Sequence, residues 1–372
     1  MQKEKYKLVF VFLLVFISMI AIGLSKPALT FKVKSLEMGG KLVGLKVGLL
    51  TSFFMIFRAM GSAISTKVRR KRIVVFIGFS IFGICFMLYN LFSSYILILI
   101  IKPVEGILAG LTWPLVQLLV GVVSPQEWVV TSITVYFAIG KLGGQVGNVL
   151  YGFLNSKSLS LEIASFLMFL SAILALGIYS DEVKKIKKKP VKGEKLPLRV
   201  VYLSAITAGI NLGLMMEVTL YYLNVAKQLS ESQASIVYGV VGLATIAVPI
   251  IQGYIADKLS GRIVVFFSSL LIFFGGFFFS LESIKGVISG IPLVLYCAGV
   301  TSLQSLSRGL ALRAKEKQKA IGYTNALGNI GAALSPIIGG MLFPFKLLFF
   351  DSAFLIVGIL SAIFLLMFLV KA

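Results

Sequence analysis

The chain has 372 residues, of which 58% are hydrophobic and only 13% charged, with a mean hydropathy of +0.99 and a formal net charge of +22. Soluble domains are about half apolar and about a quarter charged, so this chain lacks the charged residues that would face water, and a soluble fold is excluded. The basicity would fit a nucleic-acid surface, but its distribution along the chain argues against that reading.

Apolar stretches recur throughout the chain at the length that spans a hydrocarbon core, roughly 18–25 residues. They predict an all-α integral membrane protein with twelve transmembrane helices, arranged in two pseudo-symmetric six-helix halves. An even number of spans places both termini on one side. The predicted spans are 7–25, 42–66, 73–92, 94–122, 129–153, 160–179, 200–224, 233–254, 263–281, 287–309, 319–343 and 346–369.

The N-terminal stretch 1–24 has a basic head and an apolar middle, as a signal peptide does. Its apolar run is too long for a signal peptide and no small-residue cleavage site follows, so we expect it to be the first span. The segment 26–41 is expected to be a loop on the outer side, and the other loops are short. No stretch is long enough to form a separate soluble domain.

Most Lys and Arg residues fall on the side of the termini, chiefly in the clusters 67–72, 184–199 and 308–319. Cytoplasmic loops carry such an excess. The charge therefore indicates topology rather than nucleic-acid binding, and predicts a multi-pass protein of the cell membrane with both termini in the cytoplasm.

Two landmarks recur in the two halves. RIVVF occurs at 72–76 and at 262–266, and FAIGKLGGQVGNVLYG, from Phe137, aligns with NALGNIGAALSPIIGG, from Asn325. Each landmark falls on the same span of its half, which indicates an internal repeat. The predicted organisation is an N-terminal six-helix bundle at 1–179, a basic cytoplasmic linker at 180–199 and a C-terminal six-helix bundle at 200–372.

The stretch GYIADKLSGR contains Gly253, Asp257 and Arg262. It resembles the motif Gly-x-x-x-Asp-x-x-x-Gly-Arg of the major facilitator superfamily (MFS), which joins the second and third helices of each half. The resemblance implies a transporter in which Asp257 latches one conformation. A carboxylate here can accept hydrogen bonds from a neighbouring helix N-terminus, where the macrodipole favours an anion; the alternative is a simple helix-end solubilising role.

The first half departs from this motif, because Lys67 takes the position of the Asp while Arg72 matches the Arg. We therefore expect a latch only at Asp257. The fourth span resembles the fourth-helix motif of the same family, with Lys102 in place of an Arg. The SPIIGG at 335–340 is similar to an antiporter-type motif of exporters, which favours efflux.

Ionisable residues within membrane spans are costly and are functional candidates by default. Lys102, Trp113 and Gln117 share one helix face by their spacing, which suits a wet central cavity. The alternative is a local pair of Lys102 with Glu105 at i, i+3.

Lys141 lies near the middle of its span on one face with Gln145, and its counterpart in the second half is Asn329. Both helices are predicted to line the cavity. Glu217 is a candidate proton carrier or substrate counter-ion, or else an outer-end residue in water. Arg58, near the cytoplasmic end of its span, is predicted to be a gate or a lipid-headgroup contact.

The sequence thus predicts a secondary active transporter that moves a small solute by alternating access, coupled to protons, with efflux favoured over uptake. Lys102 and Lys141 would attract an anionic group, while Glu105 or Glu217 exchanges a proton. Alternatives are an uncoupled facilitator, an importer of a small organic anion or sugar, and a non-transporting receptor or scaffold on the same fold.

An integral membrane enzyme is disfavoured because no nucleophile–base pair is evident. The chain has no His, and Cys85 and Cys297 lie in apolar spans, so we expect no metal and no cofactor. The expected partners are the small-molecule substrate, protons and the lipid bilayer, without nucleic acid, and the expected state is a monomer.

Overall fold

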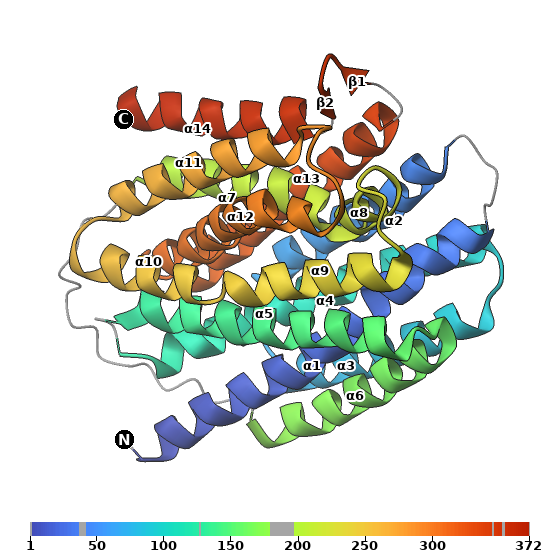
Figure 1. Cartoon of the computed structure of the whole chain (residues 1–372). Helices are drawn as coiled ribbons and strands as arrows, with labels where there is room; N and C mark the ends of the chain where they lie inside the picture. The colour runs from blue at the N-terminus through green and yellow to red at the C-terminus, as the bar shows by residue number, and fades with distance from the viewer. Residues whose placement is uncertain are drawn as a thin grey trace.

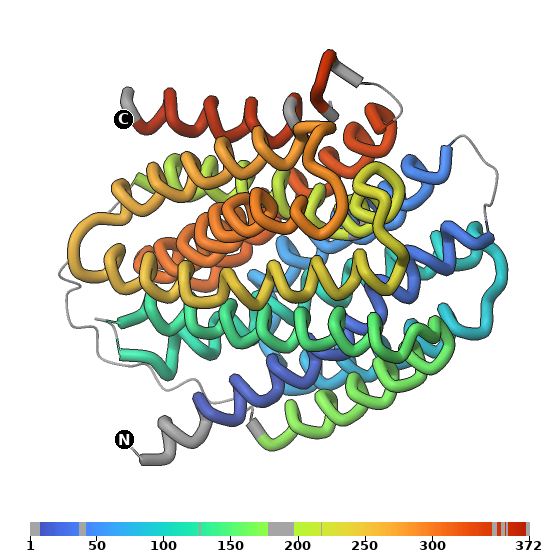
Figure 2. Tube along the Cα trace, viewed as in Figure 1, coloured from blue at the N-terminus to red at the C-terminus, as the bar shows by residue number. Residues whose placement is uncertain are grey.

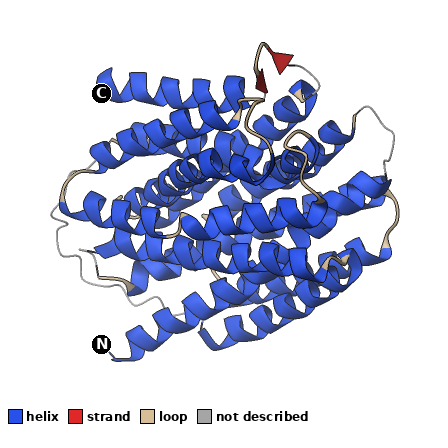
Figure 3. Ribbon diagram, in the orientation of Figure 1, coloured by secondary structure: helices blue, strands red, loops and turns tan. Residues whose placement is uncertain are grey.

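The computed structural model describes residues 2–36, 42–125, 128–178, 197–343, 346–351 and 354–371. Nearly all of these residues are helical (Figure 3). The strands among them, β1 (Lys346–Leu347) and β2 (Phe350–Asp351), form one short antiparallel hairpin. The all-α prediction is confirmed.

The six helices of the N-terminal half follow the first six predicted spans closely, except at the end of the first. That helix continues through most of the predicted outer loop 26–41 and ends at Leu36, and Phe31 and Val33 of this extension are fully buried. The helices are α1 (Gln2–Leu36), α2 (Val43–Ser65), α3 (Lys71–Leu91), α4 (Tyr95–Val123), α5 (Val129–Leu154) and α6 (Lys157–Ile178).

In the C-terminal half, several shorter helices follow one another end to end and form six helical rods. Together with the six helices of the N-terminal half, the described residues contain twelve rods, one for each predicted span. The predicted linker lies outside the described residues as far as position 196. The helices are α7 (Leu198–Gly213), η2 (Leu214–Val218), α8 (Thr219–Val225), α9 (Glu231–Ala244), α10 (Ala247–Lys258), α11 (Gly261–Phe279), η3 (Gly286–Ser289), α12 (Gly290–Ala311), α13 (Lys317–Leu342), η4 (Phe354–Ile359) and α14 (Leu360–Lys371).

The molecule is a multi-pass membrane protein. Ten helical segments of the described chain are long and apolar enough to cross a membrane, and Ile356–Leu369 is a shorter apolar helix. Large apolar side chains, such as Phe153 at 75% and Phe166 at 67% exposed, remain on the outside. Such a surface is stable against lipid, which provides no competing hydrophobic effect.

Both chain termini lie at one end of the helix bundle (Figures 1 and 2). The same end carries the turn after α2, with Arg69 and Arg70, and the turn between α10 and α11. We call it the basic end. The opposite end carries the last turn of α1 and the first turn of α9.

The two halves repeat the same helix pairings. In the N-terminal half α5 packs lengthwise on α1, and in the C-terminal half α13 packs on α7. The glycines that recur in the sequence explain this, because a methyl group on Gly143 would lie 2.4 Å from the carbonyl oxygen of Phe16, and one on Gly331 would lie 2.5 Å from that of Ile206. The backbones approach closely only because Cβ is missing.

The halves meet along two seams. The α5 seam is the contact of α5 with α9 and α10, and the α13 seam is the contact of α13 with α2. The cavity described below lies between them.

Candidate functional site

A cavity of about 240 Å³ lies between the two halves. Aromatic and aliphatic side chains form most of its wall, among them Phe54, Trp113 and Phe137. Such a wall with a few polar groups is typical of small-molecule sites. The polar and charged lining residues are Ser25, Lys26, Arg58, Tyr89, Lys102, Glu105, Gln117, Tyr136, Lys141, Gln145, Tyr238, Thr301 and Gln304.

The halves also touch on both sides of this cavity. At the opposite end, Lys34 Nζ lies 3.2 Å from Glu231 Oε1, and a methyl group on Gly48 would lie 2.3 Å from the carbonyl oxygen of Pro336. At the basic end, Gln318 Nε2 of α13 donates to the carbonyl oxygens of Ser65 (3.1 Å) and Thr66 (2.9 Å). The halves are therefore in contact at both ends of the cavity.

The wall formed by α4 carries a buried ion pair. Lys102 Nζ donates to Glu105 Oε2 at 2.9 Å, and the Tyr89 hydroxyl donates to the same oxygen at 2.6 Å. The side chains of the pair are only 6% and 8% exposed. Cavity lining and local pairing, treated as alternatives from the sequence, are therefore both present.

The same helix continues toward the basic end with Trp113 and Gln117, which line the cavity as the stripe predicts. Gln117 Oε1 accepts a hydrogen bond of 2.8 Å from Asn325 Nδ2 of α13, in the other half. Asn329 was expected at the cavity wall. The structure instead buries it between the halves, where its Nδ2 donates to Ser62 Oγ at 3.1 Å.

Lys141, near the middle of α5, lines the cavity together with Gln145. Its Nζ donates to the hydroxyl oxygens of Thr245 and, at 3.3 Å, Thr301, both in the C-terminal half. Among the described residues no carboxylate pairs with Lys141. The lysine therefore joins the two halves through neutral hydroxyl partners.

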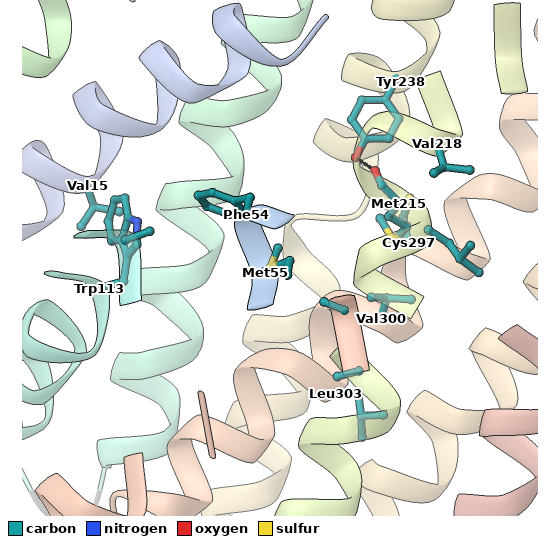
Figure 4. Packing of buried hydrophobic residues seen from close by; sticks show 14 of the residues in the cluster. Val15, Phe54, Met55, Trp113, Met215, Val218, Tyr238, Cys297, Val300 and Leu303 are labelled. Atoms are coloured by element: carbon teal, nitrogen blue, oxygen red, sulfur yellow. Dashed lines mark hydrogen bonds between the residues drawn. The ribbon is translucent and has the colours of Figure 1, made fainter. Parts of the chain in front are cut away.

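Lys26 is a cavity residue that the sequence analysis missed, because 26–41 was taken for a loop. Its Nζ donates to Tyr238 Oη at 2.9 Å and to the Met215 carbonyl oxygen at 3.1 Å. That carbonyl also accepts from the Tyr238 hydroxyl, the contact drawn as a dashed line in Figure 4. The Met215 carbonyl is free to accept these bonds because Met216 (φ −77°, ψ −127°) interrupts the helix at η2. In the sequence, the apolar residues that continue past Pro27 could have indicated that the first helix extends beyond Lys26.

Arg58 faces inward rather than toward lipid headgroups. It lines the cavity and its guanidinium lies 5.7 Å from the centre of the Phe54 ring. Arg308 was assigned from the sequence to the cytoplasmic cluster 308–319, but it lies within α12 and is 2% exposed. Its acceptors are neutral: Asn325 Oδ1 (3.4 Å), the Gln304 carbonyl (3.2 Å) and Ser307 Oγ (3.1 Å).

Asp257 makes the contact with a helix N-terminus that was predicted for it. Its Oδ2 accepts from the backbone N–H (2.7 Å) and the hydroxyl (2.6 Å) of Thr131, in the first turn of α5. Its Oδ1 accepts from Arg313 Nη2 at 2.5 Å. The carboxylate therefore ties the C-terminal half to the N-terminal half at the basic end.

The other motif residues behave differently. Gly253 allows α10 to approach α5, since a methyl group there would lie 2.3 Å from the Thr134 hydroxyl oxygen. Arg262 donates to the Leu369 carbonyl of α14, away from Asp257. Arg72 is exposed in the first turn of α3.

The backbone of Glu217 belongs to η2, but its side chain lies outside the described residues. Within the described part of the chain, no group of three His, Cys, Asp or Glu residues is placed to hold a metal ion. Cys85 and Cys297 are buried free thiols.

Comparison with known proteins gives consistent matches along the chain. The family model of the Major Facilitator Superfamily matches residues 11–314. The quinolone resistance protein NorA of Staphylococcus aureus (strain MSSA476) is 24% identical over 349 residues, covering 92% of this chain and 85% of NorA. An uncharacterised MFS-type transporter of Methanocaldococcus jannaschii is 20% identical over 370 residues and covers 92% of each chain.

Solved structures match the whole fold. The nucleoside transporter NupG superposes with a TM-score of 0.66 at 14% identity, covering 98% of this chain and 99% of NupG. The human organic anion transporter MFSD10 superposes with a TM-score of 0.68 at 15% identity, covering 99% and 98%. At these identities the likeness is one of fold.

Proposed function

The chain belongs to the major facilitator superfamily and is a membrane transporter rather than an enzyme, and from this premise we propose that it exports small amphipathic solutes across the cell membrane in exchange for protons. The observation that carries the proposal is the central cavity, which lies between two halves in contact at both ends and has a wall that is aromatic, apolar and charged at once. Alternating access requires such a site between two rigid bundles that rock against each other.

Glu105 is the proposed proton carrier. Its carboxylate is buried and accepts hydrogen bonds from Lys102 and Tyr89, so that Lys102 is its counter-charge. If Lys102 turns to another anion in the cavity, Glu105 is left buried without its counter-charge, and binding a proton becomes the less costly state. Occupation of the cavity and protonation of Glu105 are thereby coupled. The backbone position of Glu217, beside the cavity residues Met215 and Met216, keeps it as a second candidate.

The direction of transport is proposed from the relatives. NorA is named for quinolone resistance, and its match extends over both halves of this chain. Resistance is the effect expected of export, and the mixed aromatic and charged wall suits amphipathic compounds of that kind. We place the basic end in the cytoplasm, because loops rich in Lys and Arg remain on that side.

The test is internal pH in proteoliposomes that hold the purified full chain, with pools of quinolones and other drugs, sugars, amino acids and organic acids added in turn. We expect at least one pool to change the internal pH, and Glu105→Gln to abolish the change. Glu316→Gln is the matched control, because Glu316 is an exposed acid whose partner is Lys319 on the surface.

Other outcomes would replace the proposal. Tracer uptake without any pH change, unaffected by Glu105→Gln, would identify an uncoupled facilitator or importer. If no pool changes the internal pH and no tracer is taken up, a receptor or scaffold on the transporter fold would be favoured.

A further inference from the structure

Two arginines from opposite halves converge at the basic end of the cavity. Arg58 of α2 lines the cavity, and Arg308 of α12 lies one helical turn beyond the lining residue Gln304. Both are cations, and the hydrogen bonds described next connect Arg308 with the helix that carries Arg58. The seam between the halves thus carries like charges on its two sides.

A chain of hydrogen bonds connects Arg308 with α2, the helix that carries Arg58, across the α13 seam. Ser62, one turn after Arg58, accepts from Asn329, and Asn325, one turn before Asn329, accepts from Arg308 Nε. Asn325 also donates to Gln117 of the cavity wall. These neutral contacts position the Arg308 guanidinium and tie α13 to α2, the helix of Arg58, but none of them neutralises a charge.

No carboxylate of the described chain pairs with either arginine. Among the described residues, the acid that lines the cavity with Arg58 is Glu105, and its donors Lys102 and Tyr89 converge on one of its oxygens. All the acceptors of Arg308 are neutral. Two cations without an ion-pair partner in a low-dielectric interior are costly, and an anion that contacts both would reduce that cost.

We propose that Arg58 and Arg308 bind the negatively charged group of the transported solute, a carboxylate or similar oxyanion, between the two halves. The inference rests on the proposed transport function and names its substrate class. A guanidinium presents planar, paired N–H donors that match the two oxygens of a carboxylate. Because the arginines come from different halves, a bound anion would also favour closure of the basic end around the solute.

The remaining cavity extends this assignment. Beyond the arginines, Lys141 lies at mid-depth, and Lys26 and Lys102 lie toward the opposite end. An anion entering at the basic end therefore meets further cations along the cavity, of which Lys102 is paired with Glu105. Trp113 and Phe54 provide apolar surface for the rest of the molecule, so the solute is expected to be an aromatic or aliphatic organic anion.

The experiment compares three probes of one shape on the full chain in lipid nanodiscs. Tritiated 1-naphthoate is the anion, and unlabelled 1-naphthamide and 1-naphthylmethylammonium compete with it as neutral and cationic counterparts. We expect naphthoate to bind about tenfold or more tighter than the amide, as charge-assisted hydrogen bonds are stronger than neutral ones. The ammonium compound should compete least.

Variants test the two arginines separately. Arg58→Gln and Arg308→Gln should each reduce naphthoate affinity about tenfold while leaving amide binding unchanged, and Arg308→Lys should fall between because it keeps the charge and loses the fork. Arg69→Gln, the same exchange at an exposed turn, is the matched control. If Arg308→Gln does not fold, Arg58→Gln still decides, because its side chain borders the cavity.

Equal affinity of the wild-type protein for anion and amide would overturn the proposal, as would preference for the ammonium compound. Equal competition by sulfate would assign the arginines to inorganic anions and overturn it as well. These failures are distinct from failure of the proposed function: transport of a drug pool without anion preference refutes only this inference. Selective naphthoate binding without transport of any pool refutes only the function.

Discussion

The two seams between the halves use the same geometry with different chemistry. In the α5 seam, the N-terminus of α5 meets Asp257 at the end of α10 through two hydrogen bonds. In the α13 seam, the N-terminal turn of α13 meets the end of α2, but there the donor is Gln318 and the acceptors are backbone carbonyls. The position equivalent to Asp257 is Lys67, which is exposed. A carboxylate contact in one seam is thus replaced by an amide contact in the other, with the helix arrangement preserved.

This difference predicts that the contact at the basic end is stronger in the α5 seam than in the α13 seam. A carboxylate at a helix N-terminus that also binds Arg313 gains charge-assisted hydrogen bonds, whereas the Gln318 amide gains neutral ones. The sequence predicted only one latch, because it looked for an acid at the end of α2. The structure shows two contacts, and we expect the α13 seam to separate more easily at the basic end.

The largest expected effect comes from removing the charge of the α5 seam. Asp257→Asn leaves the guanidinium of Arg313 buried, with Nε and Nη1 already lacking partners. Breaking a buried ion pair by removing one partner costs roughly 3–5 kcal/mol. We expect a clearly lower thermal unfolding temperature in detergent and faster opening of the basic end. Asp257→Glu, which keeps the charge, is the control, and an unchanged unfolding temperature in Asp257→Asn would show that the pair does not support the fold.

The next largest effect is expected from crowding each seam at the opposite end by a glycine-to-alanine substitution. A methyl group on Gly48 would meet the backbone oxygen of Pro336, whereas one on Gly152 would meet the side chain of Ile236, at 2.5 Å. A side chain can rotate away and a helix backbone cannot. Overpacking of this kind costs about 1–3 kcal/mol, so Gly48→Ala should hold the opposite end open, and Gly152→Ala should do so much less.

The measurement is the labelling rate of a cysteine introduced at the cavity residue Gln145, using a membrane-impermeant maleimide. The native thiols Cys85 and Cys297 are buried and should contribute little. Faster labelling from the opposite end in Gly48→Ala than in Gly152→Ala is expected. Equal rates would mean that both seams tolerate the same crowding.

The fold was predictable because each helix that crosses lipid needs a long apolar run, and each run can be recognised in the sequence independently of the others. The cavity residues on regular helix interiors, Lys102, Trp113 and Lys141, followed from helical spacing alone. Lys26 and Arg308 did not, because each lies where a basic residue near a span end is indistinguishable from a loop residue. Their placement depends on helix α1 continuing past Pro27 and on α12 extending to Ala311.

The contacts across the seams were also beyond the sequence, apart from Asp257. Asn329 was expected at the cavity wall because its counterpart Lys141 is there. Its pairing with Ser62 depends on how far one helix has moved along the other. Such positions are set by packing between halves, which no pattern within one helix records.

A smaller effect is expected from the neutral contact of the α13 seam. Gln318→Ala removes two hydrogen bonds to the carbonyls of Ser65 and Thr66, each worth about 0.5–1.5 kcal/mol net. The thermal unfolding temperature should fall less than in Asp257→Asn, and the α13 seam should open more often. Gln318→Glu is the sharper variant, because a carboxylate facing carbonyl oxygens repels them. If Gln318→Ala matched Asp257→Asn, the two seams would be equally strong despite their chemistry.

The smallest effect is expected from a substitution that gives the α13 seam the same acid as the α5 seam. Lys67→Asp places a carboxylate after α2, near the first turn of α13, where it can accept hydrogen bonds from backbone N–H groups as Asp257 does from α5. An anion at an exposed helix N-terminus gains about 0.3–1 kcal/mol. Lys67→Ala is the control, because it removes the cation without adding the acid. If Lys67→Asp unfolds at a higher temperature than Lys67→Ala, and the difference shrinks as salt is added, the second latch lacks only its acid. If the two variants unfold at the same temperature, Gln318 already makes the contact that the acid would make.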